Sequence, residues 1–334
     1  MATATAKAPA NSFWADRLAE SLDPRCINGI IIGVAGWPVG FGIQWLGKKW
    51  ERVPFEYLGT ALTYLGAILA ALLVARWILY MVSPRTGTLL DREVGAYFLS
   101  PIAYLVLIGL LVITTINFWL LVETLTRVRA EAAGELSPIA QFVAYNLWFW
   151  LGMLFVIPVI TMRLIAEEKR SGTIEVLMTA PVTETQVVLS KFFASLLFYG
   201  LAVSPTTILL LILRFAGKYE FEVLPVVATY IGTFTVGAMF LSVGLFFSSM
   251  TKNQIIAAML TFAVLILLFS TFVLEDFSTQ LGAWADVVKY VAVLAHLGDL
   301  GKGVMDLKYI LFHVSVVIFM LFVTVKVVEA RKWR

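Results

Sequence analysis

Long apolar runs without a charged residue dominate the chain. Each run is close to or above the about 20 residues that an α-helix needs to cross the hydrocarbon layer of a membrane. None of them alternates apolar and polar residues, as the strands of a membrane barrel would. The pattern therefore predicts an all-α, polytopic integral membrane protein. The eight runs are residues 26–47, 57–75, 94–122, 136–162, 192–213, 223–251, 253–274 and 309–325.

Composition supports the same class and excludes several others. The chain has 334 residues, of which 60% are hydrophobic and only 14% are charged. Soluble domains carry about 25% charged residues to cover their surface, so a soluble enzyme is excluded, and the apolar content excludes a disordered chain. The net charge of +3 is too small to indicate a nucleic-acid partner. The single Cys26 cannot form an internal disulfide, and His296 and His313 cannot by themselves form a zinc site.

The N-terminal part divides into two predicted regions. Residues 1–25 are expected to be a cytosolic tail, in which residues 13–22 either form a short surface helix or fray. They contain no apolar stretch typical of a secretory signal. Residues 26–82 are expected to supply two additional transmembrane segments. The run 26–47 is rich in glycine and also contains Pro38, so it either spans the membrane or forms a re-entrant or interfacial segment.

The distribution of lysine and arginine predicts the orientation, because these residues accumulate on the cytosolic side. Basic residues are concentrated in the C-terminal tail and in the loop 163–191, whereas acidic residues outnumber basic ones in the segment 275–308. We therefore expect the C-terminus and, with eight spans, the N-terminus on the cytosolic side of the membrane. The bias is modest, since Lys48, Lys49 and Arg52 fall in the first external loop.

A short amphipathic segment precedes the third apolar run. Pro84 and Gly87 are expected to interrupt the chain, and residues 88–100 to form a helix that lies in the membrane interface, with apolar residues on one face. The alternative is the polar start of one long third helix. Ser100 and Pro101 are expected to begin the next span as N-cap and first-turn proline. The residues assigned to this interfacial helix and its end are Arg92, Glu93, Tyr97, Phe98, Ser100 and Pro101.

The second cytosolic feature is the loop 163–186, which follows the fourth predicted span. Its first residues mix both charge signs, and Gly172 is expected to stop a helical turn. Ile174–Thr179 is expected to form a short helix, and Thr183 with Gln186 a capping box ahead of the next span. A stiff amphipathic segment of this kind suits a groove on a cytosolic partner.

The residues of this loop resemble a known family. The segment EEKRSGTIEVLMTAPV (167–182) is similar to the coupling loop of ABC-2 type transporter permeases, and most similar to the gliding-motility-associated branch. Three further segments resemble the same branch, in order along the chain. They are DREVGAYFLSPIAY (91–104), SSMTKNQIIAA (248–258) and HLGDLGKGVMDLKY (296–309).

The resemblance implies an architecture of six core helices per subunit, paired with a second permease subunit in a homo- or heterodimer and with two cytosolic ATPase subunits. Residues 83–334 would form this ABC-2 permease core, and residues 1–88 have no counterpart in the family pattern. The implied core consists of spans at about 101–122, 140–162, 187–213, 224–249, 254–274 and 309–326, the coupling loop 163–186 and the external segment 275–308.

The resemblance also implies that the chain is not an enzyme and binds no cofactor itself, since ATP and magnesium would sit on the partner ATPase. In agreement, Gly298, Gly301 and Lys302 do not have the spacing of a phosphate-binding loop. Contact with the ATPase would fall to the coupling loop. The residues assigned to it are Glu167, Glu168, Lys169, Arg170, Ser171, Gly172, Thr173, Ile174, Glu175 and Leu177.

Two functions remain open from the sequence: ATP-driven export of an unidentified substrate, and transmission of force to an external assembly without flux. The centres of the spans carry no acidic or basic residue, which argues against a proton- or ion-coupled carrier and suits a lipidic cargo. His296 and Asp306 are expected to be local caps or loop contacts, and His313 to be packed.

Overall fold

The computed structural model describes residues 84–128, 147–173, 182–215, 223–276 and 290–330. Within these ranges the chain forms helices and turns and no strand. The chain divides into two compact units, Met1–Arg92 and Glu93–Arg334, and nearly all of the first lies outside the described residues. The predicted tail 1–25 and the two additional segments within 26–82 therefore also lie outside them.

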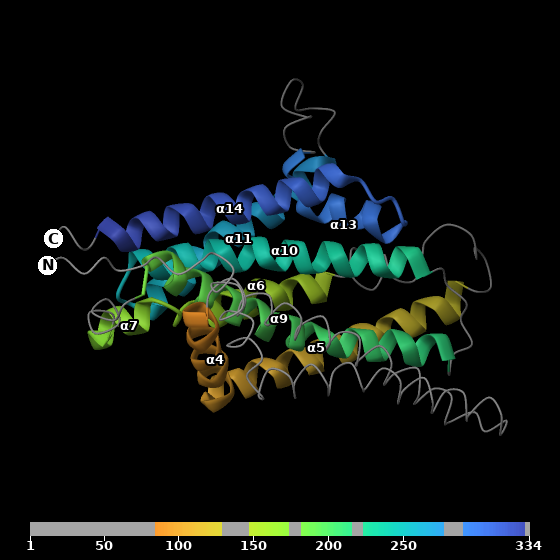
Figure 1. Ribbon diagram of the computed structural model, residues 1–334. Coiled ribbons are helices and arrows are strands. Elements are labelled where there is room, and N and C mark those ends of the chain that lie inside the picture. The colour runs from red at the N-terminus through yellow and green to blue at the C-terminus, as the bar shows by residue number, and fades with distance from the viewer. Residues whose placement is uncertain (1–83, 129–146, 174–181, 216–222, 277–289, 331–334) are drawn as a thin grey trace, which may run out of the picture. The chain divides into compact units, whose positions relative to one another are not determined.

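Figure 1 shows the helices, most of which are long. Among the described residues, six helical segments are long and apolar enough to cross a membrane: Pro101–Leu125, Trp148–Ser171, Glu184–Leu210, Pro225–Met250, Gln254–Thr271 and Leu307–Glu329. The prediction of an all-α, polytopic membrane protein is thereby confirmed. The described helices are α4 (Pro84–Leu99), α5 (Pro101–Val128), α6 (Leu147–Thr161), α7 (Ala166–Ser171), α9 (Glu184–Phe215), α10 (Val223–Met250), α11 (Gln254–Asp276), α13 (Val293–Gly301) and α14 (Leu307–Glu329).

The amphipathic helix before the first described span is longer than expected. α4 begins at Pro84, ahead of residue 88, and continues through Gly87, which does not interrupt it. A proline at the first helical position costs no hydrogen bond, because that N–H has no partner within a helix. α4 ends at Leu99, Ser100 is not helical, and α5 begins at Pro101. The expected boundary follows from Pro101, which disfavours a helical conformation at the residue before it.

The second unit is built around α10. This helix packs against α6, α9, α11, α13 and α14, and α14 runs beside it in Figure 1. Glycines allow two of these close approaches: a Cβ at Gly237 would meet the ring of Tyr199, and one at Gly244 would meet Thr161. The Tyr199 hydroxyl also donates a hydrogen bond of 3.0 Å to the carbonyl of Thr233.

An outer set of helices presents apolar side chains away from this core. α5, α11 and α14 expose residues such as Leu105, Met259 and Ile318, whereas α6, α9 and α10 are largely buried. Exposed apolar surface of this extent is unfavourable in water and suits the hydrocarbon of a bilayer.

The end of the bundle that holds the start of α10 is closed by α13. Leu297 and Leu300 of α13 are fully buried above Gly232 of α10. Nδ1 of His296 lies 3.4 Å from Nε2 of His313 in α14, and both histidines are buried. The expectation that His313 is packed is therefore confirmed.

The first turn of α14 is capped as the sequence suggested. The Asp306 carboxylate accepts a hydrogen bond of 3.0 Å from the backbone N–H of Lys308. The Lys308 ammonium, 2.7 Å away, and this backbone bond lower the pKa of Asp306. Asp306 is therefore a local helix cap.

Candidate functional site

The break between α6 and α7 is the structural origin of the candidate site. α6 ends at Thr161, and the next turn tightens, with the N–H of Leu164 donating 3.2 Å to the carbonyl of Thr161. α7 then begins at Ala166. A helix break leaves backbone donors and acceptors without intrahelical partners, and burying them unpaired is costly.

A single hydroxyl from another helix satisfies this break. Ser248 Oγ, near the end of α10, accepts hydrogen bonds of 3.1 Å from the N–H groups of both Ile165 and Ala166. The same hydroxyl donates 3.3 Å to the carbonyl of Met162. Ser248 is completely buried. It therefore binds the end of α6 and the start of α7 to α10.

Lys169 makes the second connection between α7 and α10. Its ammonium donates a hydrogen bond to the backbone carbonyl of Ser249, in the last turn of α10. The last carbonyls of a helix have no intrahelical partner, and a cation there also interacts favourably with the helix dipole. The Lys169 side chain is buried, so it points into the protein.

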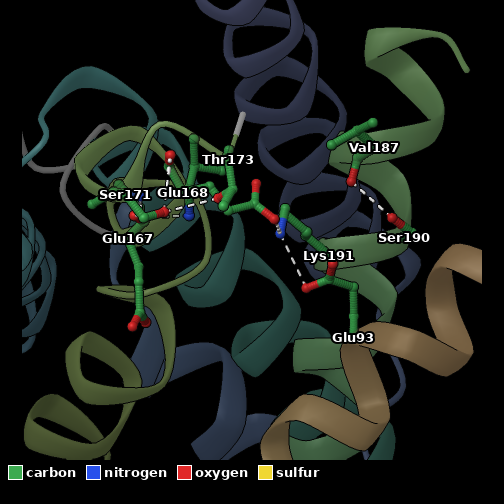
Figure 2. A network of polar contacts seen from close by, with 11 residues as sticks. Glu93, Glu167, Glu168, Ser171, Thr173, Val187, Ser190 and Lys191 are labelled. Carbon is green, nitrogen blue, oxygen red and sulfur yellow. Dashed lines mark hydrogen bonds and ion pairs between the residues drawn. The ribbon is translucent and has the colours of Figure 1, made fainter. Parts of the chain in front are cut away.

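A buried lysine on α9 joins α7 to α4. Lys191 Nζ lies 2.7 Å from Oε1 of Glu168 in α7 and 3.0 Å from Oε2 of Glu93 in α4. The Lys191 side chain is 2% exposed, and the two carboxylates are 19% and 12% exposed. Figure 2 shows the ammonium between the two glutamates. This ion-pair triad links α7 and α9 to α4, whose Glu93 is 98 positions from Lys191 in the sequence.

Tyr97 fixes the end of α4 against the same break. Its hydroxyl donates 3.2 Å to the carbonyl of Ile160, close to the end of α6. Its ring stacks on Phe198 of α9, with centroids 4.8 Å apart. Burial, and then the charge of Glu93, raise the pKa of Tyr97 well above its usual range. The phenol therefore stays protonated and remains a hydrogen-bond donor.

The outer surface of α7 is polar and exposed. Glu167, Arg170, Ser171 and Thr173 are exposed, and Glu167 points away from Lys191 in Figure 2. Gly172 ends the helix with a φ of 75°, a left-handed conformation that glycine adopts without strain. Ser171 Oγ and Thr173 Oγ1 lie 2.8 Å apart just beyond.

The structure therefore separates the residues that the sequence grouped together. Glu168 and Lys169 contact other helices of the chain, whereas Glu167, Arg170, Ser171 and Thr173 face outward around the turn at Gly172. Ile174, Glu175 and Leu177 lie outside the described residues, as does the short helix expected there. The expected capping box is confirmed. The backbone N–H of Thr183 donates a hydrogen bond of 3.0 Å to Oε1 of Gln186, and the backbone N–H of Gln186 donates one of 3.3 Å to Oγ1 of Thr183.

The expected interfacial residues are likewise divided. Glu93 and Tyr97 take part in the contacts around α7, whereas Arg92 and Phe98 are exposed. The hydroxyl of Ser100 accepts a hydrogen bond of 3.3 Å from Nη1 of Arg163. Pro101 is the first residue of α5.

Three residues of the network were not assigned to the candidate site by the sequence analysis: Lys191, Ser248 and Ser249. One signal could have identified Lys191, because it lies two turns inside the helix that the Thr183 capping box begins, in an otherwise apolar run. A cation at such a place needs a counter-charge. No comparable signal marks Ser248, because serines in apolar helices usually bond to their own backbone.

The network connects helices and offers no reactive constellation. Its contacts are ion pairs and backbone hydrogen bonds, and the described residues contain no cluster of three or more side chains suited to a metal ion. What this arrangement can do is transmit a displacement of α7 to α4, α9 and α10.

The fold and the site together define a multi-pass, all-helical membrane protein with one short polar helix tied to the ends of its spans. Residues 139–296 match the family model described as ABC-2 family transporter protein. Such domains belong to the membrane-embedded, non-catalytic permease subunits of ABC transporters, which pair with ABC ATPase subunits. The match includes α6, α7, α9, α10 and α11, and no curated protein matches the chain.

Proposed function

We propose that this chain is the permease subunit of an ABC-2 exporter in the cytoplasmic membrane of a bacterium, with its C-terminus in the cytosol. Separate cytosolic ATPase subunits bind ATP and magnesium and contact the coupling loop 163–186. A second permease subunit, identical or related, completes the membrane part.

One observation carries this proposal: α7 has two sides with different tasks. Its outer side presents Glu167 and Arg170, opposite charges that can orient a partner. Its inner side is bound to α10 through Lys169 and to α9 and α4 through Glu168. A partner that moves the outer side therefore moves the ends of several spans.

The proposed mechanism follows from these contacts. Closure of the ATPase dimer on ATP displaces α7. Ser248 and Lys169 transfer the displacement to the end of α10, and Lys191 transfers it to α9 and α4. Because packed helices rearrange between discrete arrangements rather than deforming gradually, the spans would switch between two packings.

A double charge reversal on the outer side tests the proposal. In the chain reconstituted with its ATPase, Glu167→Lys with Arg170→Glu is expected to abolish copurification and the stimulation of ATP hydrolysis, while the thermal unfolding temperature stays unchanged. The matched control reverses Lys326 and Glu329, an exposed ion pair of 2.7 Å in the last turn of α14. It should leave both readouts intact. Normal copurification of the first variant, or equal losses in both, would contradict the proposal.

The cargo and the branch of the family are further parts of the proposal. The resemblance to the gliding-motility-associated branch favours either an amphiphilic cargo or, as the alternative function, force transmission without flux. Reconstituted vesicles separate the two. Movement of labelled lipid coupled to ATP hydrolysis supports export, whereas ATP turnover without any flux supports the mechanical role.

A further inference from the structure

Arg163 differs from the other buried or half-buried cations at this end of the bundle. Lys191 faces two carboxylates, and Lys169 faces a backbone carbonyl. Arg163 makes one hydrogen bond, of 3.3 Å, to the neutral hydroxyl of Ser100. Its Nε is buried without a hydrogen-bond partner, and no carboxylate among the described residues pairs with it. A partly buried guanidinium without a counter-charge is unfavourable, so an anion from outside the described chain is expected there.

The surroundings of Arg163 indicate which anion. Ser100 lies at the junction of α4 and α5, where Leu99 is 86% exposed. From this junction a row of exposed side chains follows α5 at helical spacing, beginning with Tyr104, Leu105 and Ile108. The cation thus lies at the head of an apolar surface that runs along a membrane-spanning helix.

We propose that the guanidinium of Arg163 and the hydroxyl of Ser100 bind the phosphate of an anionic phospholipid. The lipid's acyl chains lie along the exposed face of α5. A planar guanidinium binds phosphate oxygens through two parallel charged hydrogen bonds, which a lysine cannot reproduce. The positive end of the α5 dipole at Pro101 adds to the attraction. A carboxylate of a protein partner is disfavoured, because the surface next to the guanidinium is apolar rather than a polar rim.

The proposed lipid site acts on the same junction that positions Tyr97. The backbone at the end of α4 is held by the Tyr104 hydroxyl, which donates 2.9 Å to the carbonyl of Phe98. A lipid bound to Ser100 and Arg163 would connect α4, α5 and the end of α6. It requires only that the chain is embedded in a membrane, and it does not depend on the ATPase partner.

Lipid titration of the purified full chain in neutral detergent tests this inference. Dioleoylphosphatidylglycerol is expected to raise the thermal unfolding temperature saturably and to remain bound in native mass spectra, whereas dioleoylphosphatidylcholine is not. Arg163→Gln should weaken the phosphatidylglycerol affinity about tenfold or more, as expected for a lost charged hydrogen bond. Arg170→Gln, which removes an exposed arginine of α7, is the matched control and should bind as the wild type does.

Further controls identify the source of the phosphate and provide replacement variants in case Arg163→Gln misfolds. Inorganic phosphate at the same concentration should produce no shift; an equal shift would overturn the lipid assignment in favour of a free-anion site. If Arg163→Gln does not fold, Arg163→Lys and Ser100→Ala replace it. Each is expected to keep the wild-type unfolding temperature in the absence of lipid and to bind phosphatidylglycerol more weakly. Wild-type affinity in these variants, or equal responses to the two lipids, would overturn the proposal.

Discussion

The two ends of α10 are held by different forces. At its C-terminal end, α7 is attached by two directional polar contacts, the hydroxyl of Ser248 and the ammonium of Lys169, while the triad around Lys191 holds α7 to α9 and α4. At its N-terminal end, α13 is attached mainly by close packing of Leu297 and Leu300 on Gly232. The comparison teaches that the α7 end can be released by changes in charge or hydrogen bonding, whereas the α13 end is sensitive to size.

This difference fits the proposed movement of α7 and the position of α13 at the closed end of the bundle. Polar contacts have short ranges and defined directions, so an attachment made of a few of them can be exchanged as a unit when a partner supplies other contacts. A close-packed apolar interface cannot exchange its contacts in this way, because displaced side chains leave voids. The α7 end is therefore suited to movement and the α13 end to closure of the bundle.

The largest expected effect is at the triad. Lys191→Met leaves the carboxylates of Glu93 and Glu168 close together without their cation, and we expect the protein to lose about 3 kcal/mol of stability. Thermal or denaturant unfolding in detergent measures this loss. The triple variant that also carries Glu93→Gln and Glu168→Gln should recover most of it. A triple variant as unstable as Lys191→Met would show that the charges do not carry the contact.

The next effect concerns the break between α6 and α7. Ser248→Ala leaves the N–H groups of Ile165 and Ala166 and the carbonyl of Met162 without this partner, at an expected cost of about 2 kcal/mol. Ser249→Ala is a neighbouring control, since the Ser249 hydroxyl bonds only to the carbonyl of Phe246 in its own helix. Hydrogen exchange at residues 162–166 should increase in the first variant alone. Equal protection in both variants is the result that would refute the role of Ser248.

A smaller effect is expected from steric crowding at the α13 end. In Gly232→Ala the new Cβ would lie 2.5 Å from Cδ1 of Leu300 and 2.9 Å from Cδ2 of Leu297. Both atoms are ends of side chains that can shift, so we expect a loss of about 1 kcal/mol. Gly109→Ala in α5, where nothing lies within 4 Å, should be neutral or slightly stabilising. A loss in both variants would point to a general intolerance of alanine rather than to crowding.

The smallest effect is expected from the polar contact at that end. Thr235→Val removes the hydroxyl that lies 3.1 Å from Nδ1 of His313, and should cost no more than about 1 kcal/mol. Thr229→Val, whose hydroxyl donates 2.7 Å to the carbonyl of Pro225 in the same helix, provides the comparison. If Thr235→Val destabilised the protein as much as Lys191→Met, polar contacts would dominate both ends and the comparison would fail.

The sequence predicts the spans well, because their length and apolar composition are local properties. It also predicts Gly172 and the pair of Thr183 with Gln186, because caps and turns are formed by residues close together in the chain. It does not predict the triad, because Glu93 and Lys191 are separated by 98 positions and meet only when the helices that carry them have packed.

For the same reason, the sequence does not predict which side of α7 faces the protein. Residues 167–170 are two acidic residues followed by two basic residues, a pattern that does not indicate which face is buried. The span Trp148–Ser171 also includes residues that composition alone assigns to a solvated loop. Only the serines at the end of α10 show that Lys169 turns inward while Arg170 remains exposed. The N-terminal residues 1–83 lie outside the described residues, so their two expected spans stay a prediction.

The central claim, that the outer side of α7 faces the cytosol and is open to a partner, is tested most directly by thiol accessibility. Cys26 is the single cysteine and is first replaced by serine. Cysteine is then introduced singly at Thr173, beside Gly172, or at Met305, before α14; both positions are exposed. A membrane-impermeant reagent should label Thr173→Cys only in inside-out vesicles and Met305→Cys only in intact cells. Labelling of Thr173→Cys in intact cells would contradict the account.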